Sequence, residues 1–91
     1  MFAVTRLRVP EATVPAFLTA ADELLAALRE RLGFVRGELG RSADDPELFA
    51  LCTSWDGVGS YRRGLSAAEV KVAGAPVWVH ALDEPGVYLT D

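Results

Sequence analysis

The sequence is poor in the residues that build disulfides and metal sites. It has one cysteine, Cys52, and one histidine, His80, among 91 residues. A lone cysteine excludes an internal disulfide, and one imidazole among separated carboxylates offers no metal-ligand spacing. The glycines match neither GxxxxGK[ST] nor GxGxxG, the loops that bind phosphate in nucleotide and flavin folds. We therefore expect no metal and no cofactor, and the absence of disulfides favours a cytoplasmic setting.

Basic charge and long hydrophobic runs are also scarce. Nine Lys and Arg stand against thirteen Asp and Glu, which gives a net charge of −4. Arg6 with Arg8 and Arg62 with Arg63 are the only local basic clusters, so we expect no nucleic-acid partner. No apolar run approaches the roughly 20 residues that cross a membrane, and the first residues have a strand pattern, not that of a signal peptide. We expect no membrane partner and no targeting signal.

Apolar residues, by contrast, are abundant for a chain of this size. They make up 51% of the sequence, which we expect to form a single domain over residues 1–91. A chain this short buries only about 60–65% of the surface that its unfolded form exposes. In a small chain, surplus apolar surface often lies at an oligomer interface.

Hydrophobic periodicity divides the chain into strands and helices. The predicted strands lie at 2–9, 34–42, 48–55 and 87–90. The predicted helices lie at 14–32 and, weakened by glycines, at 57–65 and 66–73. Segment 76–82 is ambiguous, because its β-branched residues favour a strand while its apolar spacing, with Pro76 at a helix start, favours a helix. We prefer the helix.

Local signals place the ends of these helices. Thr13 is the predicted N-cap of the first helix, and Gly33 is the predicted left-handed residue that ends it. Asp56 is the predicted N-cap of the second helix, and Ser66 with Glu69 has the spacing of a capping box for the third. The first helix carries an apolar stripe made of Phe17, Ala21, Leu24, Leu25, Leu28 and Leu32.

The resulting order, β-α-β-β-α-β, is that of an α+β ferredoxin-like fold: a four-stranded antiparallel sheet with its helices on one face. The strand at 48–55 is apolar on both of its faces, which is typical of a strand covered on both sides. Phe49, Leu51 and Trp55 are predicted to face the helices. The opposite face carries Val4, Leu48, Ala50 and Cys52. Nothing else in the chain covers that face, so we expect a second copy to do so in a two-fold homodimer.

The chain resembles the antibiotic biosynthesis monooxygenase family of dimeric α/β-barrel proteins. The resemblance lies in the opening strand FAVTR, the hairpin GRSADDPELF at 40–49, TSWD at 53–56, GSYRR at 59–63, EVKVA at 69–73 and DEP at 83–85. The family includes cofactor-free oxygenases that act on polyketide anthrones, haem-degrading enzymes and members without known activity. The resemblance implies the same fold, a homodimer and a pocket between the sheet and the helices.

The resemblance also implies roles for particular residues. Trp55 is similar in position to a tryptophan that lines the family's pocket, and Tyr61 to a tyrosine of the anthrone oxidases. Thr5 and Gly74 stand where the haem-degrading branch has an asparagine and a histidine, which argues against haem degradation here.

The residues themselves suggest further chemistry, and each has a structural alternative. Histidine is the side-chain type that most readily gains or loses a proton near neutral pH, so His80 is a candidate base, or its ring satisfies a local partner. Thr5 is a candidate polar group of the pocket, or a core threonine. Trp55 stacks on an aromatic ligand or simply fills the core, and Tyr61 bonds a substrate oxygen or faces solvent.

These observations predict a cofactor-independent monooxygenase-like protein that acts on or binds a small hydrophobic, aromatic or polyketide-type ligand. Trp55, Tyr61, His80 and Thr5 are its candidate catalytic residues. Two alternatives remain open at this point: a non-catalytic dimeric ligand-binding protein of the same fold, and an isomerase or cyclase that does not use O2.

Overall fold

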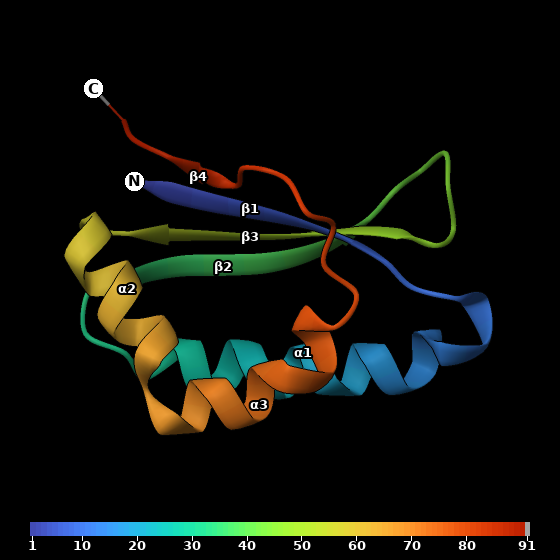
Figure 1. Ribbon diagram of the computed structural model, residues 1–91, viewed down its shortest axis with the longest axis horizontal. Coiled ribbons are helices and arrows are strands. Elements are labelled where there is room, and N and C mark those ends of the chain that lie inside the picture. The colour runs from blue at the N-terminus through green and yellow to red at the C-terminus, as the bar shows by residue number, and fades with distance from the viewer. Residues whose placement is uncertain (91) are drawn as a thin grey trace.

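A four-stranded antiparallel sheet forms one layer of the protein and helices form the other (Figure 1). This computed structural model describes residues 1–90. The strands are β1 (Phe2–Arg8), β2 (Phe34–Arg41), β3 (Leu48–Trp55) and β4 (Val87–Tyr88), in the spatial order β2-β3-β1-β4. The predicted ferredoxin-like α+β fold is therefore confirmed, and the predicted bounds of the third strand match those of β3.

The helices pack on a single face of this sheet, as Figure 1 shows. They are a short 3₁₀ turn, η1 (Glu11–Thr13), followed by α1 (Val14–Arg29), α2 (Val58–Ser66) and α3 (Ala68–Trp78). The hydrophobic core lies between the two layers, and its fully buried side chains include Leu7, Val9, Phe17, Leu24, Leu28, Phe49, Val70 and Val77.

Burial alternates along β3, because the helices of the chain cover only one face of the sheet. Phe49, Leu51 and Trp55 are buried against the helices, while Leu48 and Cys52 on the other face are only half-buried. In the register between β1 and β3, Thr5 lies opposite Leu51. Because side chains alternate along a strand, Thr5 shares the helix-facing side with Leu51.

The first helix ends three residues earlier than predicted. The N–H groups of Glu30 and Arg31 bond the carbonyls of Ala27 and Leu28, which is the tighter 3₁₀ pattern of a helix end. Leu32 then falls outside the helix and is 93% exposed instead of core. Gly33 does adopt the predicted left-handed conformation, with φ of 86°, and turns the chain into β2.

None of the predicted N-caps forms its side-chain hydrogen bond. The turn η1 holds Thr13 in helical conformation, which leaves it no capping geometry. Gly57, not Asp56, occupies the cap position of α2, and the Asp56 N–H bonds the Gly33 carbonyl. The Ser66 hydroxyl donates to the Arg62 carbonyl and therefore does not cap α3. The extended residue Ala67 separates α2 from α3.

Segment 76–82 is helical only in its first part. Pro76 lies inside α3 and not at a helix start, contrary to our interpretation of the sequence. It is tolerated there because the carbonyl that its missing N–H would bond belongs to the exposed Val72. After Trp78 the chain turns, and Ala81 forms an isolated bridge with Leu7 of β1. The prediction of a helix over the whole segment is therefore wrong beyond Trp78.

Candidate functional site

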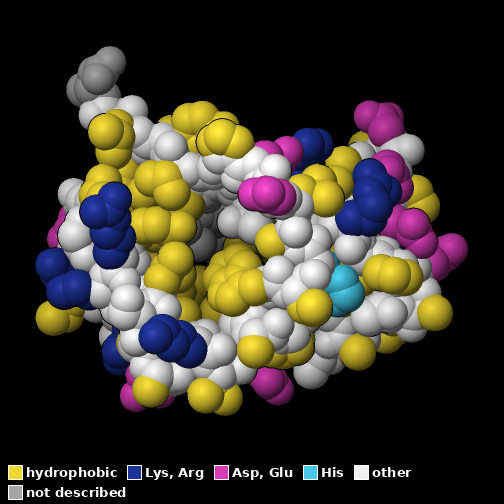
Figure 2. Space-filling model, in the orientation of Figure 1, with side chains coloured by type: hydrophobic (Ala, Val, Ile, Leu, Met, Phe, Trp, Pro, Cys, Tyr) yellow, Lys and Arg dark blue, Asp and Glu magenta, His cyan; other side chains and the backbone are white. Residues whose placement is uncertain are grey.

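A small pocket lies where α2 and the C-terminal segment meet the edge of β1. Its volume is about 240 Å³, and its lining residues are Val4, Thr5, Arg6, Tyr61, Leu82, Glu84, Gly86 and Val87. Figure 2 shows this face of the molecule hollowed between the sheet layer and the helix layer, with hydrophobic side chains gathered round the hollow. The lining combines two hydroxyls and one ion pair with apolar groups.

The wall of the pocket opposite β1 is the segment 82–86, here called the strap. It is attached to β1 at both ends, because the Leu82 N–H bonds the Arg6 carbonyl at 2.9 Å and the Val4 N–H bonds the Gly86 carbonyl at 2.7 Å. Between these two bonds the strap leaves the regular strand ladder. The pocket is therefore partly made by the interruption of the β1–β4 pairing.

Thr5 and Tyr61 reach this pocket from different layers, Thr5 from the sheet and Tyr61 from α2. Neither hydroxyl forms a hydrogen bond with another group in residues 1–90. Burial raises the pKa of the Tyr61 phenol above its ordinary value. The phenol is therefore protonated at neutral pH and is a hydrogen-bond donor, as is the Thr5 hydroxyl.

Trp55 lies behind Tyr61 and does not line the pocket directly. Its indole is only 3% exposed, and its Nε1–H donates to the Thr53 hydroxyl at 3.0 Å. The indole meets the rings of Phe34 and Tyr61 edge-on, at centroid distances of 5.1 and 5.9 Å. Gly64 of α2 also packs closely against the indole. Trp55 is thus a rigid support for Tyr61.

His80 lies apart from the other three candidate residues. It sits in the turn after α3, and its ring meets the Phe17 ring edge-on at a centroid distance of 5.7 Å. Its carbonyl accepts the Arg8 N–H at 3.0 Å. These contacts correspond to the structural alternative for His80, and the ring is not among the groups that line the pocket.

Arg6 and Glu84 are lining residues that sequence reasoning missed. The Arg6 Nε–H and Nη2–H donate to the two Glu84 carboxylate oxygens at 2.6 and 2.8 Å. This pairing lowers the pKa of Glu84 and raises that of Arg6. The sequence showed Arg6 as half of a basic pair and Glu84 as a turn residue. No local signal relates two side chains that are 78 positions apart.

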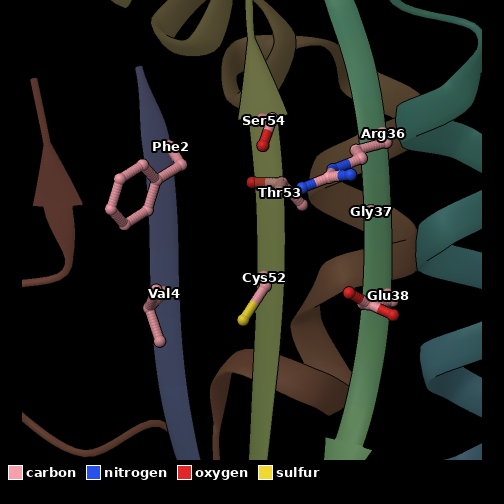
Figure 3. Close-up of a pocket in the computed structure, with 8 residues that line it drawn as sticks. All are labelled: Phe2, Val4, Arg36, Gly37, Glu38, Cys52, Thr53 and Ser54. Carbon is pink, nitrogen blue, oxygen red and sulfur yellow. The ribbon is translucent and has the colours of Figure 1, made fainter. Parts of the chain in front are cut away.

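The open face of the sheet carries a second hollow, of about 510 Å³. Figure 3 shows that side chains of β1, β2 and β3 border it, with the Arg36 guanidinium directed towards β3. At one end of this face, Phe2 stacks on Tyr88 with ring centroids 5.2 Å apart, and both side chains are exposed. Cys52 is half-buried there as a free thiol. This is the face for which we predicted a second copy.

Residues 1–90 contain no group of three or more His, Cys, Asp and Glu side chains able to hold a metal ion. Over the same residues, none of the helices combines the length and apolar character needed to span a membrane.

Comparison with known proteins places the sequence in a family. A model of the antibiotic biosynthesis monooxygenase family matches residues 1–74. The chain belongs to this family. The match covers the sheet strands β1 to β3 and most of the helix layer, including Thr5, Trp55 and Tyr61. No functionally curated protein matches the sequence.

Solved structures of antibiotic biosynthesis monooxygenases and related proteins share the fold. The chain is similar to SnoaB from Streptomyces nogalater, with a TM-score of 0.85, 21% identity, and coverage of 99% of this chain and 91% of SnoaB. It is also similar to a conserved protein from Methanosarcina mazei, with a TM-score of 0.79, 17% identity, and coverage of 94% and 84%. At these identities the likeness establishes the fold, not the substrate.

Proposed function

We propose that this family member is a cofactor-independent monooxygenase whose substrate is a small phenolic or enolisable aromatic compound. The observation that carries the proposal is the pair of unbonded hydroxyls, Thr5 and Tyr61, that line one small pocket from the sheet and from α2. SnoaB, which is similar in fold, is described as a cofactor-independent oxygenase. Convergent polar groups that fix the orientation of a ligand are a feature of small-molecule sites.

The reaction needs O2 and no other oxidant. An activated methylene group beside an enolisable carbonyl loses a proton to water and forms an enolate. One electron passes from the enolate to O2, and the resulting substrate radical and superoxide combine into a C–O bond. Protonation gives a secondary hydroperoxide, which loses water to leave a new carbonyl. In sum, the methylene group and O2 give a carbonyl group and water, so one oxygen atom enters the product.

The residues at the pocket act on the first of these steps. Tyr61 and Thr5 donate hydrogen bonds to the oxygen on which the negative charge of the enolate develops, which lowers the free energy of ionisation. Trp55 holds the Tyr61 ring in place through their edge-to-face contact. Glu84 is a weak base because its pKa is lowered by Arg6. His80, packed on Phe17, has no part in this step.

The size of the pocket limits the ligand. Its volume of about 240 Å³ is slightly below the range of about 300–1,000 Å³ that is usual for drug-sized ligands. We therefore propose a ligand of few rings.

We further propose that the protein acts as a homodimer through the open face of the sheet. Phe2 and Tyr88 are 39% and 47% exposed there, and Val4, Ala50 and Cys52 are only half-buried. A contiguous apolar patch on a small chain is most stable when a second copy covers it.

Oxygen uptake tests the proposed reaction. With 1,8-dihydroxyanthrone as substrate, we expect uptake of one O2 per quinone formed, and incorporation of one labelled atom from ¹⁸O2. Tyr61→Phe removes one donor to the developing oxyanion and should lower kcat by about 100-fold. Tyr88→Phe, which removes a hydroxyl from the opposite face, is the matched control and should leave kcat unchanged.

Other outcomes would favour the alternatives. Tight binding of this anthrone without turnover would identify a non-catalytic binding protein. Turnover of an enolisable substrate under strict anaerobiosis would identify an isomerase or cyclase. Either result would overturn the monooxygenase proposal.

A further inference from the structure

The backbone of β1 bonds its two neighbours with alternate residues. Towards β3, the Met1 carbonyl accepts the Trp55 N–H at 3.0 Å, and the Val9 N–H bonds the Glu47 carbonyl at 2.8 Å. In an antiparallel strand, the N–H and C=O of one residue point to the same side. The odd-numbered residues of β1 therefore bond β3, and the even-numbered residues point towards the strap and the turn that precedes it.

Arg6 is the even-numbered residue at which the hydrogen bonding between β1 and the C-terminal segment is incomplete. Val4 and Arg8 donate their N–H groups to Gly86 and His80, at 2.7 and 3.0 Å. The Arg6 carbonyl accepts the Leu82 N–H, but the Arg6 N–H has no hydrogen-bond partner in residues 1–90. One N–H in the middle of a strand edge is thus left without a protein acceptor.

The cause is a difference in length between the paired segments. Ala81 pairs with Leu7, and Val87 pairs with Ala3. Between these two pairs the C-terminal segment advances by six residues while β1 advances by four. The two extra residues make the strap arch away from β1, as a bulge does. No carbonyl of the strap remains opposite the Arg6 N–H.

This unpaired N–H lies on the side of β1 that faces the strap, and Arg6 is one of the residues that line the pocket described above. Three consecutive residues of β1, 4 to 6, line the pocket together with Tyr61 and the strap. Backbone N–H groups strongly require a partner, and one left in a pocket is a site for a ligand oxygen or a water. We infer that the Arg6 N–H is a third donor, with the Tyr61 and Thr5 hydroxyls, for the oxyanion of an ionised phenol or enolate.

The ion pair beside the pocket makes an anionic ligand acceptable. Glu84 alone would repel a phenolate, but both of its oxygens are bonded to the Arg6 guanidinium. The pair is neutral as a whole, so the three donors act without an opposing charge. The inference rests on the proposed function for the identity of the substrate and adds the chemical form in which the substrate binds.

Two matched variants separate the N–H of Arg6 from its side chain. Arg6→Pro/Glu84→Gln lacks the N–H, and Arg6→Ala/Glu84→Gln keeps it, while both lack the ion pair. Proline is compatible with this position because the N–H that it removes is unpaired and the preceding residue is already extended. The probe is 4-nitrophenol, whose bound phenolate fraction is measured by absorbance.

We expect the alanine variant to bind the phenolate more tightly than the phenol. The proline variant should bind the phenolate about 10- to 100-fold more weakly than the alanine variant, which is the effect of one hydrogen bond to a charged group. Affinity for the neutral phenol should differ little between the two. Equal phenolate affinities in the two folded variants would overturn the inference.

A measurement on the unaltered protein guards against misfolding of the proline variant. In ¹H–¹⁵N spectra, phenolate binding should move the Arg6 amide proton downfield and leave that of Arg8, which is already bonded, in place. An unmoved Arg6 signal at saturation would refute the donor role. If the wild-type protein does not oxidise the anthrone, the proposed function is refuted, independently of the result of 4-nitrophenol binding.

Discussion

At the scale of single residues, the candidate site depends on how closely Gly64 approaches Trp55. A Cβ atom at Gly64 would lie 2.6 Å from the Cη2 atom of the indole. The indole has no free direction in which to move, because Phe34 and Tyr61 hold it edge-on and Thr53 accepts its N–H. A glycine is therefore needed at this position for space rather than for backbone conformation.

Gly64→Ala should lower the free energy of unfolding by about 1–3 kcal/mol, as overpacking of a core does. Urea denaturation measures this change. Gly59→Ala in the same helix is the control, because a Cβ there meets only the flexible end of Arg63. The control should be neutral or slightly stabilising, by up to about 1 kcal/mol, since alanine favours helix. Equal effects of the two substitutions would contradict the packing argument.

The hydroxyl of Thr53 gives a second test at this scale. It is the acceptor for the buried Trp55 Nε1–H. Thr53→Val keeps the shape of the side chain and leaves that N–H without a partner, which should destabilise the fold by about 1–3 kcal/mol. Thr19→Val, on the exposed face of α1, is the control and should change stability by less than about 0.5 kcal/mol. Thermal denaturation measures both changes. An equal decrease in Tm for Thr53→Val and Thr19→Val would contradict the argument that the Trp55 N–H needs the Thr53 hydroxyl.

At the scale of elements, the strap is held by few contacts and one of them is sensitive to pH. The pKa of Glu84 is lowered from an ordinary value of about 4.5, first by the hydrogen bonds from Arg6. A carboxylate whose folded pKa is depressed stabilises the fold above its unfolded pKa, and this contribution is lost as the pH falls through the folded pKa. The strap should therefore loosen in acid.

We expect amide signals of the strap to shift as the pH falls below about 4.5, in ¹H–¹⁵N spectra of the whole chain. In an Asp83→Asn background, Glu84→Gln should abolish this titration, because an amide does not change charge in this range. Asp45 also has a lowered pKa, first because the Glu47 N–H bonds it, and it titrates at the far hairpin as an internal reference. An unchanged strap titration in Glu84→Gln would show that another group is responsible.

At the scale of the whole molecule, the open face of the sheet is the surface on which we propose that a second copy binds. The chain has a mass of 9.8 kDa, and light scattering should give twice this value if a second copy covers the face. Cys52→Asp places a charge at the middle of that face, opposite Val4 and Glu38, and should give the mass of a single chain, because an unpaired buried charge costs several kcal/mol. Ala75→Asp on exposed α3 is the matched control and should leave the dimer intact. A mass of one chain for the wild type at every concentration would exclude the dimer.

The sequence by itself determined the order of the helices and strands and which face of β3 packs against the helices. Periods of two and 3.6 residues reflect which side chains are buried, so β3 and the body of α1 were predictable from local pattern alone. Gly33 was predictable because a left-handed residue after a helix favours glycine. Two of the N-cap predictions failed for different reasons: the Ser66 hydroxyl donates to the Arg62 carbonyl within α2, and Gly57 instead of Asp56 occupies the cap position of α2.

Only the tertiary structure decided what the pocket contains. Thr5 and Tyr61 line the same pocket because Thr5 faces the helix layer from β1 while Tyr61 comes from α2, whereas the turn after α3 places the His80 ring against Phe17 of α1. Arg6 and Glu84 come together across 78 positions, and the length mismatch that frees the Arg6 N–H arises from pairing between distant segments. A local pattern records whether a residue is buried. It does not record which distant residue lies beside it, and that contact makes the site.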